Sequence, residues 1–209
     1  MDRQILEVRL PYGSDEDYME LILIRHGESE ANAITDDEKK IYIGRWDCAL
    51  TEKGRQQALG LRGHPELQNA DAWYCSDLKR AEETARLMGG CSIIPDSRLA
   101  ERSLGDFEGR RVEEIKNSPL YREFFTDPAL SLFRHSFSAK APNGENYSDV
   151  SRRVSSFLKD LDRGLDRVVI VSHFCVIRCI IKEVNCLSEE ETLNLKAYHC
   201  DPLVVEYDD

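Results

Sequence analysis

Two short apolar runs, each followed by a histidine, constrain the fold of this chain more than any other feature of the sequence. Residues 21–24, LILI, lead into Arg25 and His26, and residues 168–171, VVIV, lie just before His173. Uninterrupted apolar runs of this length are typical of strands buried in a parallel sheet. Helical patterns lie between the runs, as right-handed crossovers between parallel strands require. The sequence therefore predicts two parallel strands, and if these are neighbours, His26 and His173 face each other.

The carboxyl end of each predicted strand is a candidate ligand site. Ligands of open α/β sheets bind at that edge, so Arg25, His26 and His173 are candidate functional residues. Gly27 follows His26, and we expect it to permit close approach of a substrate or to supply a backbone angle that other residues avoid. For the R-H-G tripeptide alone, an ordinary strand-to-loop turn with an exposed polar pair is an equal alternative. Two strand-ending histidines among only five in the chain can also arise by chance.

The size and charge of the chain indicate a globular protein whose partner is a small molecule. Its 209 residues, 41% of them hydrophobic, suit a single domain over residues 1–209 with a substantial core. The formal net charge of -11 argues against a nucleic-acid partner, because a polyanion would be repelled. The N-terminal stretch lacks the apolar core of a signal peptide, and no apolar run approaches the length of a membrane span. We therefore expect a cytoplasmic protein with no membrane partner and no nucleic-acid partner.

The cysteines show neither a metal-binding nor a disulfide pattern. They are seven in number, and no two have C-x-x-C spacing. We expect buried free thiols in a reducing compartment and no metal site. The cysteines are Cys48, Cys75, Cys91, Cys175, Cys179, Cys186 and Cys200.

Between the two apolar runs, helical and strand patterns alternate. The pattern predicts a helix over 51–61, a second strand at 72–75, a helix over 76–88 with Ser76 as its N-cap, and a third strand at 92–94. Residues 148–165 carry apolar side chains at helical spacing, which predicts a helix packed on the sheet.

Two further polar residues lie near the ends of predicted strands. Arg80 is in the second turn of the 76–88 helix, close enough to the second strand to reach the same edge as Arg25. The alternative for Arg80 is a solvent-facing arginine in a salt-bridged helix. Glu101 lies in the loop after the third strand, where it is one acidic residue among many.

Two segments lie outside the alternating pattern. Residues 1–20 form an N-terminal extension whose alternating side chains predict an edge strand or hairpin arm, with no chemistry assigned. Residues from about 110 to 141 lose the strand signals and are rich in aromatic residues, which predicts a helical and loop insertion that shapes the substrate mouth. The aromatic rings either pack that insertion or line the mouth, and in the second case we expect an apolar or ring-bearing leaving group.

Six segments, taken in order, resemble the histidine phosphatase superfamily in its phosphoglycerate mutase-like branch. They are RHGESEAN, GRWDCALTEKGRQQA, CSDLKRAEETA, RLAERSLGDFEG, PNGEN and VVIVSHFCVIR. The set spans roughly residues 21–183, and its order is far more specific than any single motif. The resemblance implies a three-layer α/β fold of the phosphoglycerate mutase-like type, with a mostly parallel central sheet and helices on both faces. It also implies a catalytic histidine that becomes phosphorylated.

Matching the motif positions carries the roles of the family onto this sequence. The resemblance implies that His26 is the nucleophile, that Glu101 is the proton donor, and that Arg25, Arg80 and His173 form the phosphate pocket. The resemblance also implies that Asn32 binds the phosphate, and we add Gly44 and Phe174 as candidate substrate-binding positions.

The implied roles are consistent with the chemistry of phosphoryl transfer. A neutral imidazole can attack phosphorus directly, and hydrolysis in two steps through phosphohistidine needs no metal and no cofactor. Two guanidiniums suit a group whose negative charge spreads over three oxygens, and a protonated His173 would add a third positive partner. The leaving oxygen needs a proton, which a carboxylic acid holds near neutral pH only where burial or negative neighbours raise its pKa. Glu101 could then also activate water.

The sequence departs from the family pattern at several positions. Phe174 stands where glycine commonly follows the second histidine, and we expect its ring to narrow or redirect the pocket. The charged loop within residues 33–43 is longer than its counterpart in the family, which changes the pocket wall between Asn32 and Gly44. Ala31 precedes Asn32 in place of tryptophan, and the loop ERSLGDFEG lacks the tyrosine usual in mutases. Both of the last two departures favour a phosphatase.

The favoured function is a metal-independent phosphatase acting on a small phosphorylated metabolite. The alternatives are a 2,3-bisphosphoglycerate-dependent phosphoglycerate mutase and a non-catalytic member that binds a phosphorylated ligand or protein. The presence of Glu101 together with His26 and the other implied site residues argues against the non-catalytic alternative, because a protein that only binds phosphate needs no proton donor. The sequence indicates neither the particular phosphomonoester nor the oligomeric state.

Overall fold

The computed structural model describes residues 18–208, so most of the predicted N-terminal extension lies outside the described residues. A five-stranded sheet with the order β3-β2-β4-β1-β5 forms the centre of the molecule. Its strands are β1 (Met19–Arg25), β2 (Ala72–Cys75), β3 (Ile94–Pro95), β4 (Arg167–Ser172) and β5 (Leu203–Tyr207). Neighbouring strands from β3 to β1 run parallel, and β5 pairs antiparallel with β1. The prediction of a mostly parallel sheet is confirmed.

The two apolar runs are adjacent strands at the middle of this sheet. Leu23 of β1 pairs with Ile170 of β4, and Arg25 pairs with Ser172. The ladder continues past both strands, because the backbone N–H of His26 donates to the carbonyl of Ser172 at 3.0 Å. His26 and His173 therefore leave the sheet side by side at one edge, as predicted.

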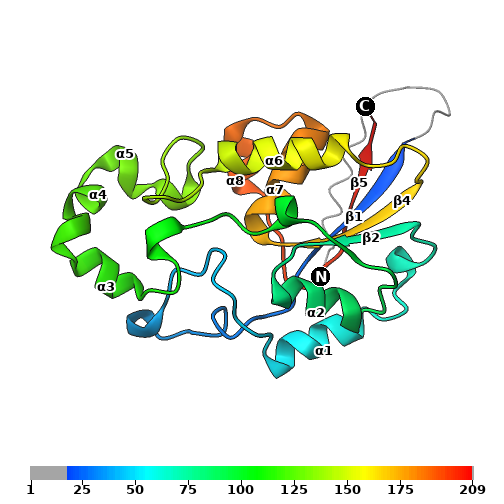
Figure 1. Ribbon diagram of the computed structural model, residues 1–209, viewed down its shortest axis with the longest axis horizontal. Helices are drawn as coiled ribbons and strands as arrows, with labels where there is room; N and C mark the ends of the chain where they lie inside the picture. The colour runs from blue at the N-terminus through cyan, green and yellow to red at the C-terminus, as the bar shows by residue number, and fades with distance from the viewer. Residues whose placement is uncertain (1–17, 209) are drawn as a thin grey trace.

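Helices cover both faces of the sheet, which confirms the three-layer arrangement (Figure 1). Helices α6 (Tyr147–Lys159), α7 (Phe174–Asn185) and α8 (Glu189–Asn194) lie on one side, and α1 (Glu52–Gly60) and α2 (Lys79–Leu87) on the other. Side chains of β1 alternate between the two layers, as the pleat of a strand requires. Leu21 and Leu23 belong to the core with α6 and α7, and Ile22 and Ile24 belong to the core with α1 and α2. These four side chains are fully buried, and each contributes roughly 1.5–3 kcal/mol through burial.

Helices α3 (Val112–Asn117), α4 (Arg122–Thr126) and α5 (Pro128–Ser131) form a lobe to one side of the sheet (Figure 1). The ring of Phe107 is the centre of its core and contacts the rings of Tyr121, Phe124, Phe125 and Phe133. The aromatic residues in this predicted helical insertion thus pack against one another. Their number is therefore explained by the core of the lobe and gives no support for an apolar leaving group.

Several predicted element boundaries are wrong, for local reasons. The predicted strand 92–94 is displaced to Ile94–Pro95, because Ser92 has a left-handed φ of 51° that no strand accommodates. Ser76 does not cap α2, because the N-cap position is Leu78. The hydroxyl of Ser76 contacts His173 and accepts from the backbone N–H of Leu78. Helix α6 ends at Lys159, before residue 165, and its start is fixed by a capping box of Asn146 and Asp149. Strand β5 and helix α8 were not predicted.

Short 3-10 turns connect the longer elements. They are Asp37–Lys39, Pro65–Leu67, Ser97–Leu99, Gly105–Phe107, Pro119–Tyr121 and Phe133–His135. No helix within residues 18–208 combines the length and the apolar character that a membrane span requires.

Candidate active site

His26 is buried directly after β1, with only 4% of its surface exposed. Its Nδ1 lies 2.7 Å from the carbonyl oxygen of Gly27, and because a carbonyl can only accept, Nδ1 carries the proton. Nε2 is then unprotonated and available as a nucleophile. Burial, followed by the positive charges of Arg80 and Arg25, holds the pKa of His26 well below its usual value. The imidazole is therefore neutral near pH 7.

His173 is fully buried after β4, and its ring centroid lies 4.9 Å from that of His26. Its Nε2 is 2.8 Å from the hydroxyl of Ser76, which also accepts from the backbone N–H of Leu78. Its Nδ1 is buried without a hydrogen-bond partner among the described residues. Burial, followed by the charges of Arg80 and His26, holds the pKa of His173 well below its usual value. His173 is thus neutral near pH 7, and it becomes the predicted third cation only where the charge of a bound anion raises its pKa enough for the ring to gain a proton.

Arg25 and Arg80 converge on these histidines from two elements. The Nη1 of Arg25 donates to the carbonyl of Ala197 at 3.1 Å. Arg80, on α2, is 1% exposed and donates to the carbonyls of Trp46 (3.0 Å) and Gly44 (2.9 Å). The alternative of a solvent-facing Arg80 is therefore wrong.

Both guanidiniums have unused hydrogen-bonding capacity. The Nε atoms of Arg25 and Arg80 are buried with no hydrogen-bond partner among residues 18–208. Neither arginine has an ion pair with a carboxylate in that part of the chain. Buried charges are normally paired, so two unpaired guanidiniums beside an open Nδ1 of His173 suit an anion with several oxygens.

Gly44 lies in a loop that contacts Arg80, and Asn32 lies in the loop that follows His26. Gly44 has a left-handed φ of 49°, and a Cβ there would lie 2.5 Å from a carboxylate oxygen of Glu108. Its contact with the pocket is the carbonyl that holds Arg80. The side-chain oxygen of Asn32 accepts from the N–H and the hydroxyl of Ser29, so only its Nδ2 can donate to a phosphoryl oxygen.

The end of the charged 33–43 loop is anchored to the lobe. The backbone N–H of Val112 donates to the backbone carbonyl of Lys40 at 2.8 Å, and that of Tyr42 donates to the backbone carbonyl of Arg110 at 3.0 Å. The ring of Tyr42 contacts those of Phe107 and Phe133. The end of this loop and the lobe therefore share one set of contacts.

Glu101 is half-buried in the loop that follows the 3-10 turn Ser97–Leu99. One carboxylate oxygen accepts from the backbone N–H of Arg102 at 2.8 Å. Burial lowers the pKa of Arg25, and the negative charge of Glu101 is the largest influence that opposes this lowering. The negative charge of Glu101 thus acts on Arg25.

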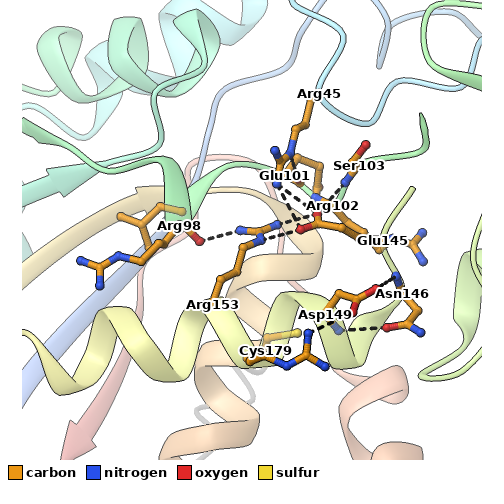
Figure 2. Close-up of polar contacts among 12 residues, drawn as sticks. Arg45, Arg98, Glu101, Arg102, Ser103, Glu145, Asn146, Asp149, Arg153 and Cys179 are labelled. Carbon is orange, nitrogen blue, oxygen red and sulfur yellow. Dashed lines mark hydrogen bonds and ion pairs between the residues drawn. The ribbon is translucent and has the colours of Figure 1, made fainter. Parts of the chain in front are cut away.

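Two other carboxylates near Glu101 are engaged in holding loops. Glu145 accepts from both Arg45 and Arg153 and from the backbone N–H of Ser103 (Figure 2). Arg45 also donates through Nε to the carbonyl of Glu101 at 3.0 Å. Although burial raises the pKa of Glu145, hydrogen bonds and charge from Arg153 outweigh it and lower the pKa overall. Glu145 therefore serves as an ionised anchor.

Glu108 has a similar role. One of its carboxylate oxygens accepts from the backbone N–H groups of Arg45 (3.0 Å) and Leu104 (2.7 Å). Sequence alone did not distinguish Glu101 from Glu108 or Glu145. In the structure Glu145 forms ion pairs with Arg45 and Arg153, and one oxygen of Glu108 accepts from two backbone N–H groups. The carboxylate of Glu101 accepts only from the backbone N–H of Arg102 within the described residues.

Phe174 does not stand free in the pocket. Its half-buried ring lies between the guanidiniums of Arg25, 5.2 Å from the centroid, and Arg178, 3.9 Å from it. Arg178 in turn donates to the carbonyl of Leu195 and the hydroxyl of Tyr147. The ring therefore supports Arg25 through a cation–π contact, a role that the expectation of a narrowed pocket did not include.

One of the two roles expected of Gly27, the supply of an unusual backbone angle, is wrong. Its φ is not in the left-handed region, and a Cβ there would lie 2.4 Å from the carbonyl oxygen of Gly54. Gly27 is thus required where the loop after β1 crosses the start of α1.

Sequence reasoning missed three side chains that hold the histidines. Ser76 contacts His173, Thr84 accepts from the backbone N–H of Gly27 at 3.0 Å, and His199 contacts the carbonyl of His26 at 2.6 Å. Ser76 directly follows the predicted strand 72–75, and Ser76 and Thr84 both lie in the segment CSDLKRAEETA, yet neither was given a role at the site. Thr84 is also a polar residue on the buried face of α2. His199 lies in none of the six segments.

Known proteins are similar to this chain over nearly its whole length. The family model described as histidine phosphatase superfamily (branch 1) matches residues 21–209. A 2,3-bisphosphoglycerate-dependent phosphoglycerate mutase of Parvibaculum lavamentivorans is 30% identical over 201 residues, which is 90% of each chain. The structure of the alpha-ribazole phosphatase from Shigella flexneri has a TM-score of 0.70 and 27% identity over 88% of each chain. Bacillus stearothermophilus YhfR has a TM-score of 0.75 and 30% identity over 91% of this chain and 92% of its own.

Proposed function

The chain belongs to the histidine phosphatase superfamily, and from that premise we propose that it hydrolyses small phosphomonoesters through a phosphohistidine at His26. One observation supports this proposal most strongly. The Nδ1–H of His26 is committed to the carbonyl of Gly27, which leaves an unprotonated Nε2 near the half-buried Arg25 and the buried Arg80. The Nε atoms of both arginines are buried with no hydrogen-bond partner among the described residues. A nucleophile and an anion pocket are thus combined at one sheet edge.

In the first step, Nε2 of His26 attacks phosphorus and the bond to the leaving oxygen breaks. Arg25, Arg80 and the Nδ1 of His173 hold the three phosphoryl oxygens, whose charge they stabilise in the transition state. Glu101 gives its proton to the leaving oxygen, so that an alcohol departs.

In the second step, water attacks the phosphohistidine and phosphate leaves. Glu101, now a carboxylate, takes the proton from the attacking water. The bond between Nε2 and phosphorus breaks, and His26 returns to its neutral form. The side chains named here supply the positive charge and the proton, so neither step requires a metal ion or an organic cofactor.

A phosphoglycerate mutase is the second candidate. It is favoured by the 30% identity to the Parvibaculum enzyme of that name. A mutase would use the same phosphohistidine, but would transfer its phosphoryl group to a phosphoglycerate in place of water. The absence of tyrosine from the loop ERSLGDFEG favours the phosphatase.

Two assays separate these functions from a non-catalytic phosphate-binding role. Release of p-nitrophenol from p-nitrophenyl phosphate, unchanged by EDTA, is expected for the phosphatase, and no release would contradict the proposal. With 3-phosphoglycerate and a catalytic trace of 2,3-bisphosphoglycerate, we expect no 2-phosphoglycerate. Rapid isomerisation would establish the mutase instead. A screen of phosphorylated metabolites, with phosphate release as the readout, then identifies the substrate.

A further inference from the structure

His199 contacts the predicted nucleophile but has no role in the mechanism above. It lies between α8 and β5, and its ring centroid is 5.3 Å from that of His26. Its Nδ1 is 2.6 Å from the carbonyl oxygen of His26, so Nδ1–H is the donor. The next residue, Cys200, donates its backbone N–H to the carbonyl of Arg25 at 2.9 Å. The His199 segment thus holds the two carbonyls at the end of β1.

The peptide unit between His26 and Gly27 is held at both of its polar ends. His199 donates to its carbonyl, and its N–H donates to the hydroxyl of Thr84 at 3.0 Å. The hydroxyl of Thr84 donates in turn to the carbonyl of Arg80 at 2.6 Å. Rotation of this peptide would break two hydrogen bonds, one on each side.

The neighbouring peptide unit transmits this constraint to the imidazole. The carbonyl of Gly27 accepts from Nδ1–H of His26 at 2.7 Å, and the N–H of Glu28 donates to Gln57 at 2.9 Å. The direction of the Gly27 carbonyl therefore sets both the tautomer of His26 and the direction in which Nε2 points. Because phosphoryl transfer requires an in-line approach, a change in that direction slows the attack.

A histidine is well suited to this position because it donates without adding charge. Burial, followed by the charge of Arg25, lowers the pKa of His199 to about 4. Its ring is neutral at physiological pH, so the positive charge near the pocket remains with the arginines.

We propose that His199 is a positioning residue that orients the His26 imidazole through the His26–Gly27 peptide, without contacting the substrate. The inference rests on the proposed function, in which Nε2 of His26 is the nucleophile. It extends that function by assigning the orientation of the nucleophile to a third histidine.

Replacing His199 with asparagine or with glutamine tests which of its two ring nitrogens is needed. His199→Asn places an amide N–H near the position of Nδ1, whereas His199→Gln places one near Nε2. We expect kcat of His199→Asn to stay within about threefold of wild type, and kcat of His199→Gln and His199→Ala to fall about 10- to 100-fold with little change in KM. Activity retained by the glutamine variant and lost by the asparagine variant would mean that Nε2 contacts the substrate. Wild-type kcat in all three variants would also overturn the proposal.

Thr84 provides a second test at the other end of the same peptide. Thr84→Val removes the hydroxyl with little change of shape, and Thr84→Ser restores it. We expect Thr84→Val to lower kcat as His199→Ala does, and the double variant to lose less than the product of the two effects, because both act on one peptide. Fully multiplicative losses would contradict a shared mechanism.

A measurement without turnover keeps this inference separate from the proposed function. The ¹⁵N NMR shifts of the His26 imidazole report its tautomer in any folded variant, active or not. We expect a fixed Nδ1–H tautomer in wild type and in His199→Asn, and averaged shifts in His199→Ala. Unchanged shifts in His199→Ala would reject the positioning role, whereas an inactive wild type with the expected shifts would reject only the phosphatase.

Discussion

The two halves of the candidate site are built in different ways. The phosphate half consists of His26, His173, Arg25 and Arg80. The first three stand at the ends of paired strands whose residues 21–24 and 168–171 are fully buried, and Arg80 lies on α2. The acid half, with Glu101, lies in a loop that side-chain ion pairs hold (Figure 2).

This difference sets how firmly each half is positioned. Strand register fixes the phosphate half, whereas the acid half depends on Arg45 and Glu145, whose side chains are 38% and 20% exposed. Partly exposed ion pairs are individually weak and are screened by salt. We therefore expect large, substrate-independent effects from changes in the phosphate half, and smaller effects that depend on the leaving group from changes in the acid half.

Among the conservative substitutions, the largest effect is expected from Arg80→Lys. Lysine keeps the charge but loses the planar fork that reaches Gly44, Trp46 and the bound phosphoryl group, so kcat/KM should fall about 10- to 1000-fold on every substrate. Inorganic phosphate and vanadate should inhibit wild type competitively. Arg86→Lys, on the same helix but in an exposed pair with Glu82, is the control and should retain activity. Wild-type kinetics in Arg80→Lys would remove this arginine from the pocket.

Glu101→Gln should distinguish substrates by their leaving groups. An alkyl alcohol needs a proton as it leaves, whereas p-nitrophenolate does not, so the variant should lose much more activity on an alkyl phosphate than on p-nitrophenyl phosphate. This holds where transfer to His26 limits the rate. If dephosphorylation limits, both substrates should slow alike and phosphohistidine should accumulate, which single-turnover experiments detect. Unchanged rates with no trapped intermediate would mean that another group is the acid.

Glu145→Gln should produce a smaller effect of the same kind. Loss of the anchor charge loosens the loop that holds Glu101 but leaves the strand ends intact, so we expect a fall of about fivefold on an alkyl phosphate and little change on p-nitrophenyl phosphate. Glu114→Gln, which breaks an exposed pair with Arg110, is the control. Equal losses on both substrates would show that Glu145 supports the whole site.

A further effect, on stability and not on turnover, is expected between pH 7 and pH 5. The pKa values of His26, His173 and His199 are lower in the folded chain than the ordinary 6.5. Below about pH 6.5 the unfolded chain binds protons that the folded chain does not, so the free energy of unfolding should decrease as pH falls. Urea titrations should show this decrease, with a shallower slope for His199→Asn. A free energy of unfolding that is constant over this range would contradict the buried neutral state of these histidines.

The phosphate half could be predicted from sequence because its physical basis is local. An apolar run fixes a strand, the strand fixes where its last residue points, and two such runs bring His26 and His173 together. Arg80 could be placed because its helix begins just after β2. The strand ends identified these positions as candidate site residues, whereas their roles in phosphoryl transfer came from the family resemblance.

The acid half could not be predicted in the same way. Glu101 was singled out only by a family resemblance, because its distinction from Glu145 depends on Arg45 and Arg153, which are distant in sequence. His199 was missed for a related reason. It reaches His26 from 173 residues away, through a segment next to the unpredicted strand β5. Long-range hydrogen bonds of this kind leave no periodic pattern in the sequence.

The central claim is that His26 becomes phosphorylated during turnover. Rapid mixing of the protein with a ³²P-labelled phosphomonoester, followed by a denaturing quench and peptide mapping, measures this directly. We predict a label on His26 that is stable to base and labile to acid, forms at least as fast as kcat, and is missing from His26→Ala, which should lose nearly all turnover. Steady turnover by wild type without a labelled histidine, or full activity in His26→Ala, would contradict the account.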